Sequence, residues 1–348
     1  MKKKIHINIE EMNDETLLSV RMCDLGLEIK DTWLESCVDQ LYRELDSKGI
    51  KIHPPCYIAD EWLCPDGEPV IGIAFFLAHP RLKKLEQTMM LEVEGGDRKS
   101  CMQLLRHEAG HAVNYAYILH KRKQWRAIFG EFSAEYGDRY KYRPYSKSFV
   151  RHLEDWYAQY HPDEDFAETF AVWLDGESDW ENKYKGWKAL TKLKYVDKLM
   201  KEVSEKKPKV AKGEKFWQVA NLKTTLATYY KRKKMLYAES YADFHDMYLM
   251  RIFPSENAKG DKAFKLIKHH SRDMLDEVAL WTGEKKFIVN RLIKDVIDRC
   301  RDLGLKTGKD RTGDMLKVTT YVTTQIMNYV YTGRYRRRNE KNKSSRTV

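Results

Sequence analysis

The sequence predicts an α+β protein that is mostly helical, with a small N-terminal sheet and a basic helical region towards the C-terminus. Three observations lead to this prediction: long segments with helical periodicity, one short strand-like run, and an uneven distribution of charge. The chain has 348 residues, of which 42% are hydrophobic, so it can form sizeable cores and two domains.

The strand-like run covers residues 70–77, VIGIAFFL, and follows the turn signal Pro65-Asp66-Gly67. Such a strand either lies within the core or offers an open edge, to which an extended peptide can add through backbone hydrogen bonds. The pattern alone does not decide between these alternatives.

The strongest helix pattern covers residues 100–120, in which apolar residues recur at helical spacing. The preceding Gly95-Gly96-Asp97 is a start signal for this helix. Gly110 lies inside it and costs about 1 kcal/mol relative to alanine. A glycine at this cost indicates that another element approaches the helix closely.

The same helix contains the sequence HEAGH, in which His107 and His111 are four residues apart. Residues with this spacing lie on one face of a helix, one turn apart. Two imidazoles placed in this way can hold one Zn²⁺, and the intervening Glu108 can reach the water that the metal activates. The alternative is a solvated or core histidine pair without a metal.

A catalytic zinc site usually has a third protein ligand. Tyr117 excludes a histidine six residues after His111, and His120 falls on the opposite face of the helix. A second predicted helix begins near Pro162 and buries Glu168 among apolar residues. Because a buried carboxylate is costly unless it is paired or bound to metal, we expect Glu168 to be the third ligand.

Other acidic residues in this second helix leave alternatives open. Glu164 or Asp165 could instead bind the metal, or could hold a ligand histidine from behind. Glu168 itself could be a buried carboxylate paired with an arginine.

The stretches FLAHPRLKKLE, MLEVEGG, LRHEAGHAVNYAY and HPDEDFAETFAVWL carry a resemblance across residues 70–175. With Glu168 lying 57 residues after His111, this part of the chain resembles the gluzincin group of zinc metallopeptidases, and more closely a bacterial family of zinc-binding metallopeptidases. The resemblance implies a zincin-like domain, a peptide or protein substrate, and one zinc ion per chain held by His107, His111 and Glu168. It implies that Glu108 is the general base.

One position departs from the thermolysin-like pattern, which has an aspartate four residues after the ligand glutamate. Here that position is Val172. The partner of the ligand histidine is therefore open, and we expect it to be Asp165.

Hydrolysis also needs a donor for the developing oxyanion. Similar peptidases use a tyrosine or a histidine, and Tyr160 and His161 lie at the start of the second helix. We expect one of them to be catalytic. The alternative is that each is a loop or capping residue.

Composition restricts the protein class and its location. The N-terminal segment has basic residues but no apolar core of a signal peptide, and no apolar run is long enough for a membrane span. The six cysteines show no CxxC pair. Cys56 and Cys64 could bridge across a hairpin, but we expect reduced thiols in a cytoplasmic protein without membrane contact.

Charge divides the chain. Residues 1–203 have 30 basic and 35 acidic residues, whereas residues 204–348 have 33 and 17. We therefore predict a zinc domain at 1–203, a linker at 204–215, a basic and mainly helical region at 216–333, and a disordered basic tail at 334–348.

Within the basic region, residues 286–303 form an amphipathic pattern that predicts a helix, and residues 315–331 favour a helix without excluding a strand. Its lysines, arginines and tyrosines could bind nucleic acid, although no nucleic-acid motif is present. A solvated face or an acidic partner would account for the same charge.

Two functions follow. The first is a zinc metallopeptidase whose C-terminal half shapes access to the site. The second is a non-catalytic binding or regulatory protein on a zincin scaffold, which uses its basic half to bind nucleic acid or an acidic partner.

Overall fold

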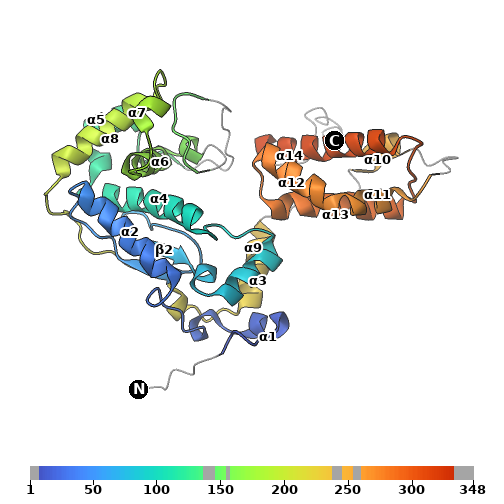
Figure 1. The fold of residues 1–348 in the computed structure, drawn as a ribbon, viewed down its shortest axis with the longest axis horizontal. Coiled ribbons are helices and arrows are strands. Elements are labelled where there is room, and N and C mark those ends of the chain that lie inside the picture. Colours follow the sequence, from blue (N-terminus) through green and yellow to red (C-terminus); the bar gives the residue numbers. More distant parts are fainter. Residues whose placement is uncertain (1–7, 136–145, 154–156, 237–244, 254–259, 333–348) are drawn as a thin grey trace, which may run out of the picture. The chain divides into compact units, whose positions relative to one another are not determined.

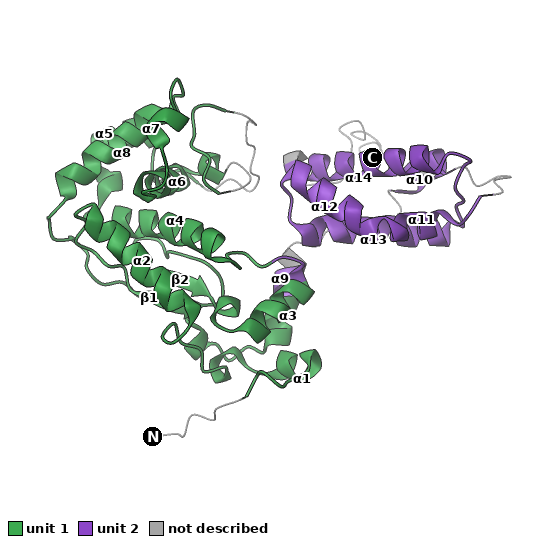
Figure 2. Cartoon of the chain, in the orientation of Figure 1, with its two compact units in different colours: residues 1–89, 93–138, 142–231 green, residues 90–92, 139–141, 232–348 purple. Residues whose placement is uncertain are grey.

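The computed structural model describes residues 8–135, 146–153, 157–236, 245–253 and 260–332. The chain divides into two compact units (Figure 2). Unit 1 comprises residues 1–89, 93–138 and 142–231, and unit 2 comprises residues 90–92, 139–141 and 232–348. Helices dominate and a small parallel sheet lies in unit 1, which confirms the predicted α+β class.

Unit 1 begins with two helices and a two-stranded sheet (Figure 1). These are α1 (Asp14–Ser19), α2 (Trp33–Ser47), β1 (Cys56–Ala59) and β2 (Ile71–Ala74). Among the described residues, β1 and β2 pair in parallel, with Ala59 opposite Ala74. The backbone of Gly72, on the other edge of β2, exchanges both hydrogen bonds with Leu63. The predicted strand is therefore confirmed for residues 71–74, and this part of its edge is already paired, whereas Phe75–Ala78 form a 3₁₀ helix.

The helices that follow build the layers around the site (Figure 1). They are α3 (Pro80–Met90), α4 (Arg98–Tyr117), α5 (Lys123–Phe129), α6 (Pro162–Leu174), α7 (Trp180–Lys183), α8 (Ala189–Val203) and α9 (Leu226–Leu236). Short 3₁₀ helices also lie in unit 1, at Met22–Asp24, Phe75–Ala78, Leu119–Lys121, Tyr157–Gln159 and Val219–Asn221. Helix α4 packs against α6, α2 and β2, and α6 packs also against α5 and α8.

Helix α4 starts where the sequence predicts. The Asp97 carboxylate accepts hydrogen bonds from the backbone N–H groups of Lys99 and Ser100, and the Ser100 hydroxyl completes a capping box. Such a cap satisfies N–H groups that have no partner within the helix.

Gly110 has the role predicted for it. A Cβ atom at this position would lie only 2.8 Å from the Ala167 Cα atom of α6. The missing side chain therefore lets the two helices approach closely enough for their polar faces to meet.

Residues 204–215, which the sequence predicts as a linker, form hydrogen bonds with unit 1. The Glu205 N–H donates to the Gly49 carbonyl, and both Lys209 and Val210 donate to the Ala116 carbonyl. The Glu214 N–H donates to the Glu68 carboxylate. The segment thus runs along unit 1, and the two units separate after Lys231. Its polar composition suits an exposed surface segment as well as it suits a linker.

The elements named in the described part of unit 2 are helices, and the loops between them include an isolated antiparallel bridge between Lys262 and Lys306. The helices are α10 (Asp246–Ile252), α11 (Ala263–His269), α12 (Ser271–Thr282), α13 (Lys286–Asp302) and α14 (Arg311–Thr332). Helix α13 confirms the pattern at 286–303, and α14 resolves the 315–331 segment as helix. In α14 the hydroxyls of Thr323 and Thr324 donate to carbonyls one turn earlier, so these β-branched residues are satisfied within a helix.

The predicted tail at 334–348 lies outside the described residues. Within the part of the chain that the structure describes, every helix is too short or too polar to cross a lipid bilayer.

Candidate metal centre

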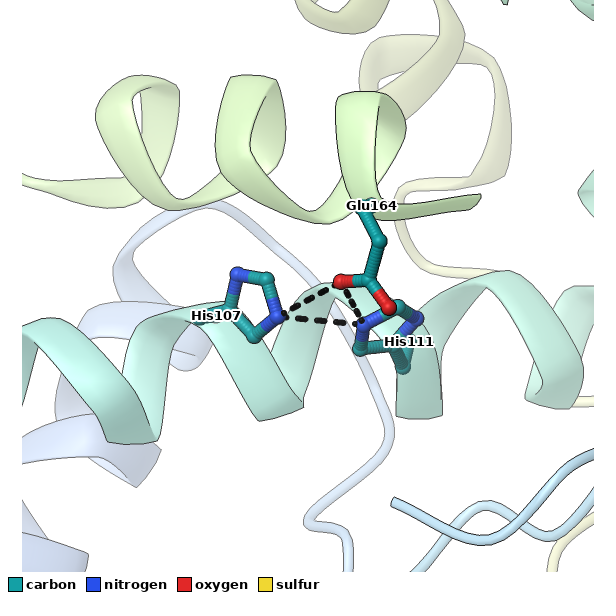
Figure 3. A group of neighbouring side chains, drawn as sticks. All are labelled: His107, His111 and Glu164. Carbon is teal, nitrogen blue, oxygen red and sulfur yellow. Dashed lines mark hydrogen bonds and ion pairs between the residues drawn. The ribbon is translucent and has the colours of Figure 1, made fainter. Parts of the chain in front are cut away.

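Helices α4 and α6 bring three potential ligand atoms together at their buried contact (Figure 3). The Glu164 Oε2 atom lies 3.1 Å from His107 Nε2 and 3.2 Å from His111 Nε2. The two Nε2 atoms are 3.2 Å apart. His107, His111 and Glu164 are all less than a tenth exposed.

These spacings fit a zinc ion. A tetrahedral Zn²⁺ with bonds of about 2.0–2.1 Å separates its ligand atoms by about 3.3 Å. The three atoms of this cluster are almost equidistant, 3.1–3.2 Å apart, which is close to that value. Two imidazole nitrogens and one carboxylate oxygen are also a donor set that zinc accepts.

The opposite nitrogens of the two histidines are held by carboxylates. The His107 Nδ1–H donates to Glu168 Oε1 over 2.9 Å, and the His111 Nδ1–H donates to Asp163 Oδ2 over 2.8 Å. A proton on Nδ1 leaves the lone pair of Nε2 directed at the candidate metal position. Such carboxylate–histidine pairs fix the tautomer and the ring orientation of metal ligands.

Both orienting carboxylates have further partners. Asp163 accepts hydrogen bonds from the Asn114 amide over 2.7 Å and from the Tyr115 hydroxyl over 2.6 Å. Glu168 accepts from the Leu153 backbone N–H over 3.0 Å. Because their remaining oxygens are bonded, these buried carboxylates are satisfied without leaving the histidines.

The electrostatics of the cluster favour a cation. Burial opposes a charge on His107, but hydrogen bonds to Glu164 and Glu168 outweigh it and raise its pKa to about 10. The pKa of His111 is raised in the same way, with Asp163 as its main partner. The pKa of Glu164 lies well below its usual range, because the two histidines outweigh the effect of burial. The site therefore attracts positive charge, which a metal ion can supply.

Glu108 lies on α4 between the two histidines and is 7% exposed. Burial raises the pKa of its carboxyl group, whereas His107 and His111 act in the opposite direction. A carboxylate that is destabilised in this way accepts a proton more readily than an exposed one.

The structure separates the three acids of α6 that the sequence offered as ligands or partners. Glu164 contacts both Nε2 atoms, whereas Glu168, the expected third ligand, contacts the far nitrogen of His107. Asp165, the expected histidine partner, instead accepts a hydrogen bond from Lys192 Nζ over 2.5 Å. The carboxylates that bond the Nδ1 atoms of the histidines are instead Glu168, at His107, and Asp163, at His111.

Of the two predicted oxyanion donors, His161 is engaged in local structure. Its Nδ1 caps α6 by accepting the Asp163 N–H over 3.1 Å, and its Nε2–H donates to the Ala134 carbonyl over 2.9 Å. The capping alternative accounts for this residue.

Tyr160, the other predicted donor, is connected to the site through Tyr157. Its ring stacks on Tyr157 with the ring centroids 6.0 Å apart, and the Tyr157 ring lies 5.6 Å from that of His107. The sequence analysis did not select Tyr157. The signal available for it is its place three residues before Tyr160.

Sequence reasoning also missed the role of Asp163, because an acid in the first turn of a helix has a sufficient explanation as a favourable charge at that end. The spacing of Glu164 and Glu168 could have indicated that both carboxylates face the histidines. They are four residues apart, so both lie on the face of α6 that meets α4.

Comparison with known families agrees with this geometry. Residues 86–229 match a family described as “Putative zinc-binding metallo-peptidase”. The match includes α4, α6 and every residue of the metal cluster. No curated protein and no solved structure matches the chain.

Proposed function

We propose that this protein is a zinc-dependent metallopeptidase that hydrolyses peptide bonds, with one zinc ion per chain. We assign the ligands as His107, His111 and Glu164. The observation that carries this proposal is the nearly equilateral arrangement of the three ligand atoms, 3.1–3.2 Å apart. The family of residues 86–229 supports the reaction class and a peptide or protein substrate.

A zinc ion at this position would supply a Lewis acid that activates water and polarises a peptide carbonyl. We assign Glu108 as the general base that takes the proton from water and passes it to the leaving amine. Its burial and its place between the two ligand histidines support this role.

Glu168 and Asp163 would act through the histidines. Each accepts the Nδ1–H of one ligand and so keeps the neutral tautomer whose Nε2 faces the metal. In this assignment the ligand glutamate is followed four residues later by an acidic residue, Glu168, as in the thermolysin-like pattern. When Glu164, rather than Glu168, is the ligand, the position four residues later is acidic, although it is a glutamate where the pattern has an aspartate.

We propose that either Tyr157 or Tyr160 donates a hydrogen bond to the developing oxyanion. The ring contact of Tyr157 with His107 supports a position beside the reacting carbonyl. Replacing the tyrosine that donates to the oxyanion by phenylalanine would lower kcat by roughly 10²–10³-fold, as loss of one oxyanion donor does. Zinc content would be unchanged in both Tyr157→Phe and Tyr160→Phe, and the variant with lower kcat identifies the donor.

The central test compares the wild type with Glu108→Gln. Metal content is measured by mass spectrometry, and hydrolysis is measured on a peptide library with the zinc-loaded protein. We expect one zinc per chain in both proteins and hydrolysis only in the wild type. Undiminished turnover in Glu108→Gln would refute the mechanism. A wild type that binds no zinc would refute the metal site itself.

A further inference from the structure

Unit 2 contains an open pocket of about 840 Å³, lined by side chains of α11, α12 and α14 and of the loops that precede α11 and α14 (Figure 2). Sites for small ligands typically have volumes of about 300–1,000 Å³, so this pocket is large enough for a short peptide. Its lining residues lie between positions 261 and 319, outside the segment that matches the metallopeptidase family.

Hydrogen bonds hold the loop that forms one side of this pocket. The Thr307 N–H donates to the Asp261 carbonyl over 2.8 Å, beside the antiparallel bridge of the same two segments. The Gly308 N–H donates to the Asp314 carboxylate over 2.7 Å, which ties the loop to the first turn of α14. This side of the pocket is therefore formed without a ligand, as is usual for binding sites.

One polar group of the lining has a bond to offer. Thr307 is 1% exposed, and its hydroxyl has no hydrogen-bond partner among the residues that the structure describes. Buried polar groups are almost always hydrogen-bonded, because an unpaired one costs free energy. A polar ligand in the pocket would supply the missing partner.

Charges of opposite sign reach the pocket from different elements. Asp273 and Glu277 of α12 are four residues apart, so both carboxylates lie on one face of that helix. Lys265 of α11 has no ion-pair partner in the described part of the chain. Arg311 pairs with Asp261 but has further N–H donors. A ligand that matches both signs carries an ammonium group and a carboxylate.

The two carboxylates of α12 retain capacity for a ligand. Glu277 accepts the Trp281 indole N–H through Oε2 over 2.9 Å. The nearest charged partner of Asp273 is His270, whose Nδ1 lies 4.0 Å from Oδ2. Because a carboxylate has about four acceptor positions, each of these groups can also bind an ammonium group.

The apolar part of the lining suits side chains of varied shape. It consists of Leu266, Met274 and Met315. Methionine has a flexible and polarisable side chain, which adapts to different apolar partners. A ligand with apolar side chains between its two charged ends therefore fits the lining better than a compact ion does.

We propose that this pocket binds short peptides with free ends. The peptide amino group pairs with the two carboxylates of α12, and the peptide carboxylate pairs with Lys265. The Thr307 hydroxyl bonds a peptide group, and the methionines contact apolar side chains. An inorganic anion would be repelled by the α12 carboxylates and a metal ion by Lys265, so the combined charges favour a zwitterion.

The test uses the full-length, zinc-loaded Glu108→Gln protein, so that hydrolysis at the proposed metal centre does not consume the probe. Isothermal titration calorimetry measures the affinity for a tetrapeptide of alanine and leucine with free ends. The same peptide is then used with an acetylated amino end or an amidated carboxyl end. We expect each blocked end to weaken binding by about 10-fold or more, because one charged hydrogen-bonded contact is lost.

Matched variants place the peptide in the pocket. Glu277→Gln and Lys265→Met should each weaken binding of the free-ended peptide by about 10-fold. Lys265→Met should leave the affinity for the amidated peptide unchanged, because that peptide has no carboxylate to lose. Asp276→Asn and Lys268→Met remove the same charges from the same helices outside the lining, and they should bind like the parent protein.

Thr307→Val removes only the buried hydroxyl and should weaken binding of all three peptides by roughly 3–10-fold, as loss of one neutral hydrogen bond does. The proposal is overturned if the free-ended peptide does not bind, if blocked peptides bind equally well, or if the pocket variants bind like the two controls. These results do not depend on the peptidase activity, which is tested separately by turnover in the wild type.

Discussion

The helix contact between α4 and α6 in unit 1 and the core of the helical bundle in unit 2 are both buried, but they differ in chemistry. The first buries two histidines and several carboxylates, including Glu108, Glu164 and Glu168. In unit 2 the inward face of α13 is entirely apolar and contacts α11, α12 and α14. This face consists of Ile288, Val289, Leu292, Ile293, Val296, Ile297 and Cys300.

The difference shows which contact serves stability and which serves function. Burying apolar area stabilises a fold by about 25 cal/mol per Å², whereas burying charge is unfavourable unless it is paired. Unit 1 accepts this cost at one contact, where the carboxylates pair with histidines and the cluster suits a cation. Substitutions at the two contacts should therefore affect different properties.

The largest effect should come from the proposed third ligand. Glu164→Ala removes one of three protein ligands, so we expect the variant to lose stoichiometric zinc during purification. Glu168→Ala removes only an orienting partner of His107, and its zinc affinity should fall by about 10–100-fold. Competition with a chromogenic chelator measures both. Retention of zinc by Glu164→Ala together with its loss in Glu168→Ala would restore Glu168 as the ligand.

In unit 2 the expected change is in stability alone. Leu292 is 2% exposed in the apolar core, and Leu292→Ala should lower the free energy of unfolding by about 2–5 kcal/mol. Denaturant unfolding followed by circular dichroism measures this loss. Zinc content should stay at the wild-type value, and a loss of zinc in this variant would break the proposed separation of roles.

The second orienting carboxylate tests whether the support of His111 matters as much as that of His107. Asp163→Asn keeps the shape of the side chain but removes the charge that accepts the His111 Nδ1–H. We expect zinc affinity to fall by about 10–100-fold, measured by the same chelator competition. An unchanged affinity would show that Asn114 and Tyr115 hold Asp163 for a structural purpose only.

Local patterns predicted much of this contact, since the start of α4 at Asp97, the start of α6 at Pro162 and both histidines follow from neighbours in the sequence. The choice between Glu164 and Glu168 as the third ligand could not be predicted from such local patterns. Both lie on one face of α6, one turn apart, and burial makes either an expensive carboxylate. Which of them reaches the Nε2 atoms depends on how α6 lies along α4, and that is set by a tertiary contact at Gly110 and Ala167.

Gly110→Ala tests that contact. Alanine improves helix propensity by about 1 kcal/mol, but its Cβ atom would meet the backbone of α6 at Ala167, which cannot move aside as a side chain can. We expect a net loss of about 1–2 kcal/mol in unfolding free energy and weaker zinc binding, because α6 must shift. A gain in stability with unchanged zinc affinity would show that α6 can shift without disturbing the ligands.

The smallest expected change in unfolding free energy comes from a helix cap, and it can be compared between two helix N-termini, one in each unit. Asp97 accepts two backbone N–H groups at the start of α4, whereas the side chain of His270 makes no capping bond at the start of α12. Asp97→Ala should therefore cost about 1 kcal/mol in denaturant unfolding, and His270→Ala should be close to neutral. Because Asp97 lies more than two turns before His107, its loss should leave zinc affinity unchanged. If zinc affinity falls as well, the capped end of α4 also helps to hold the ligand histidines in register with α6.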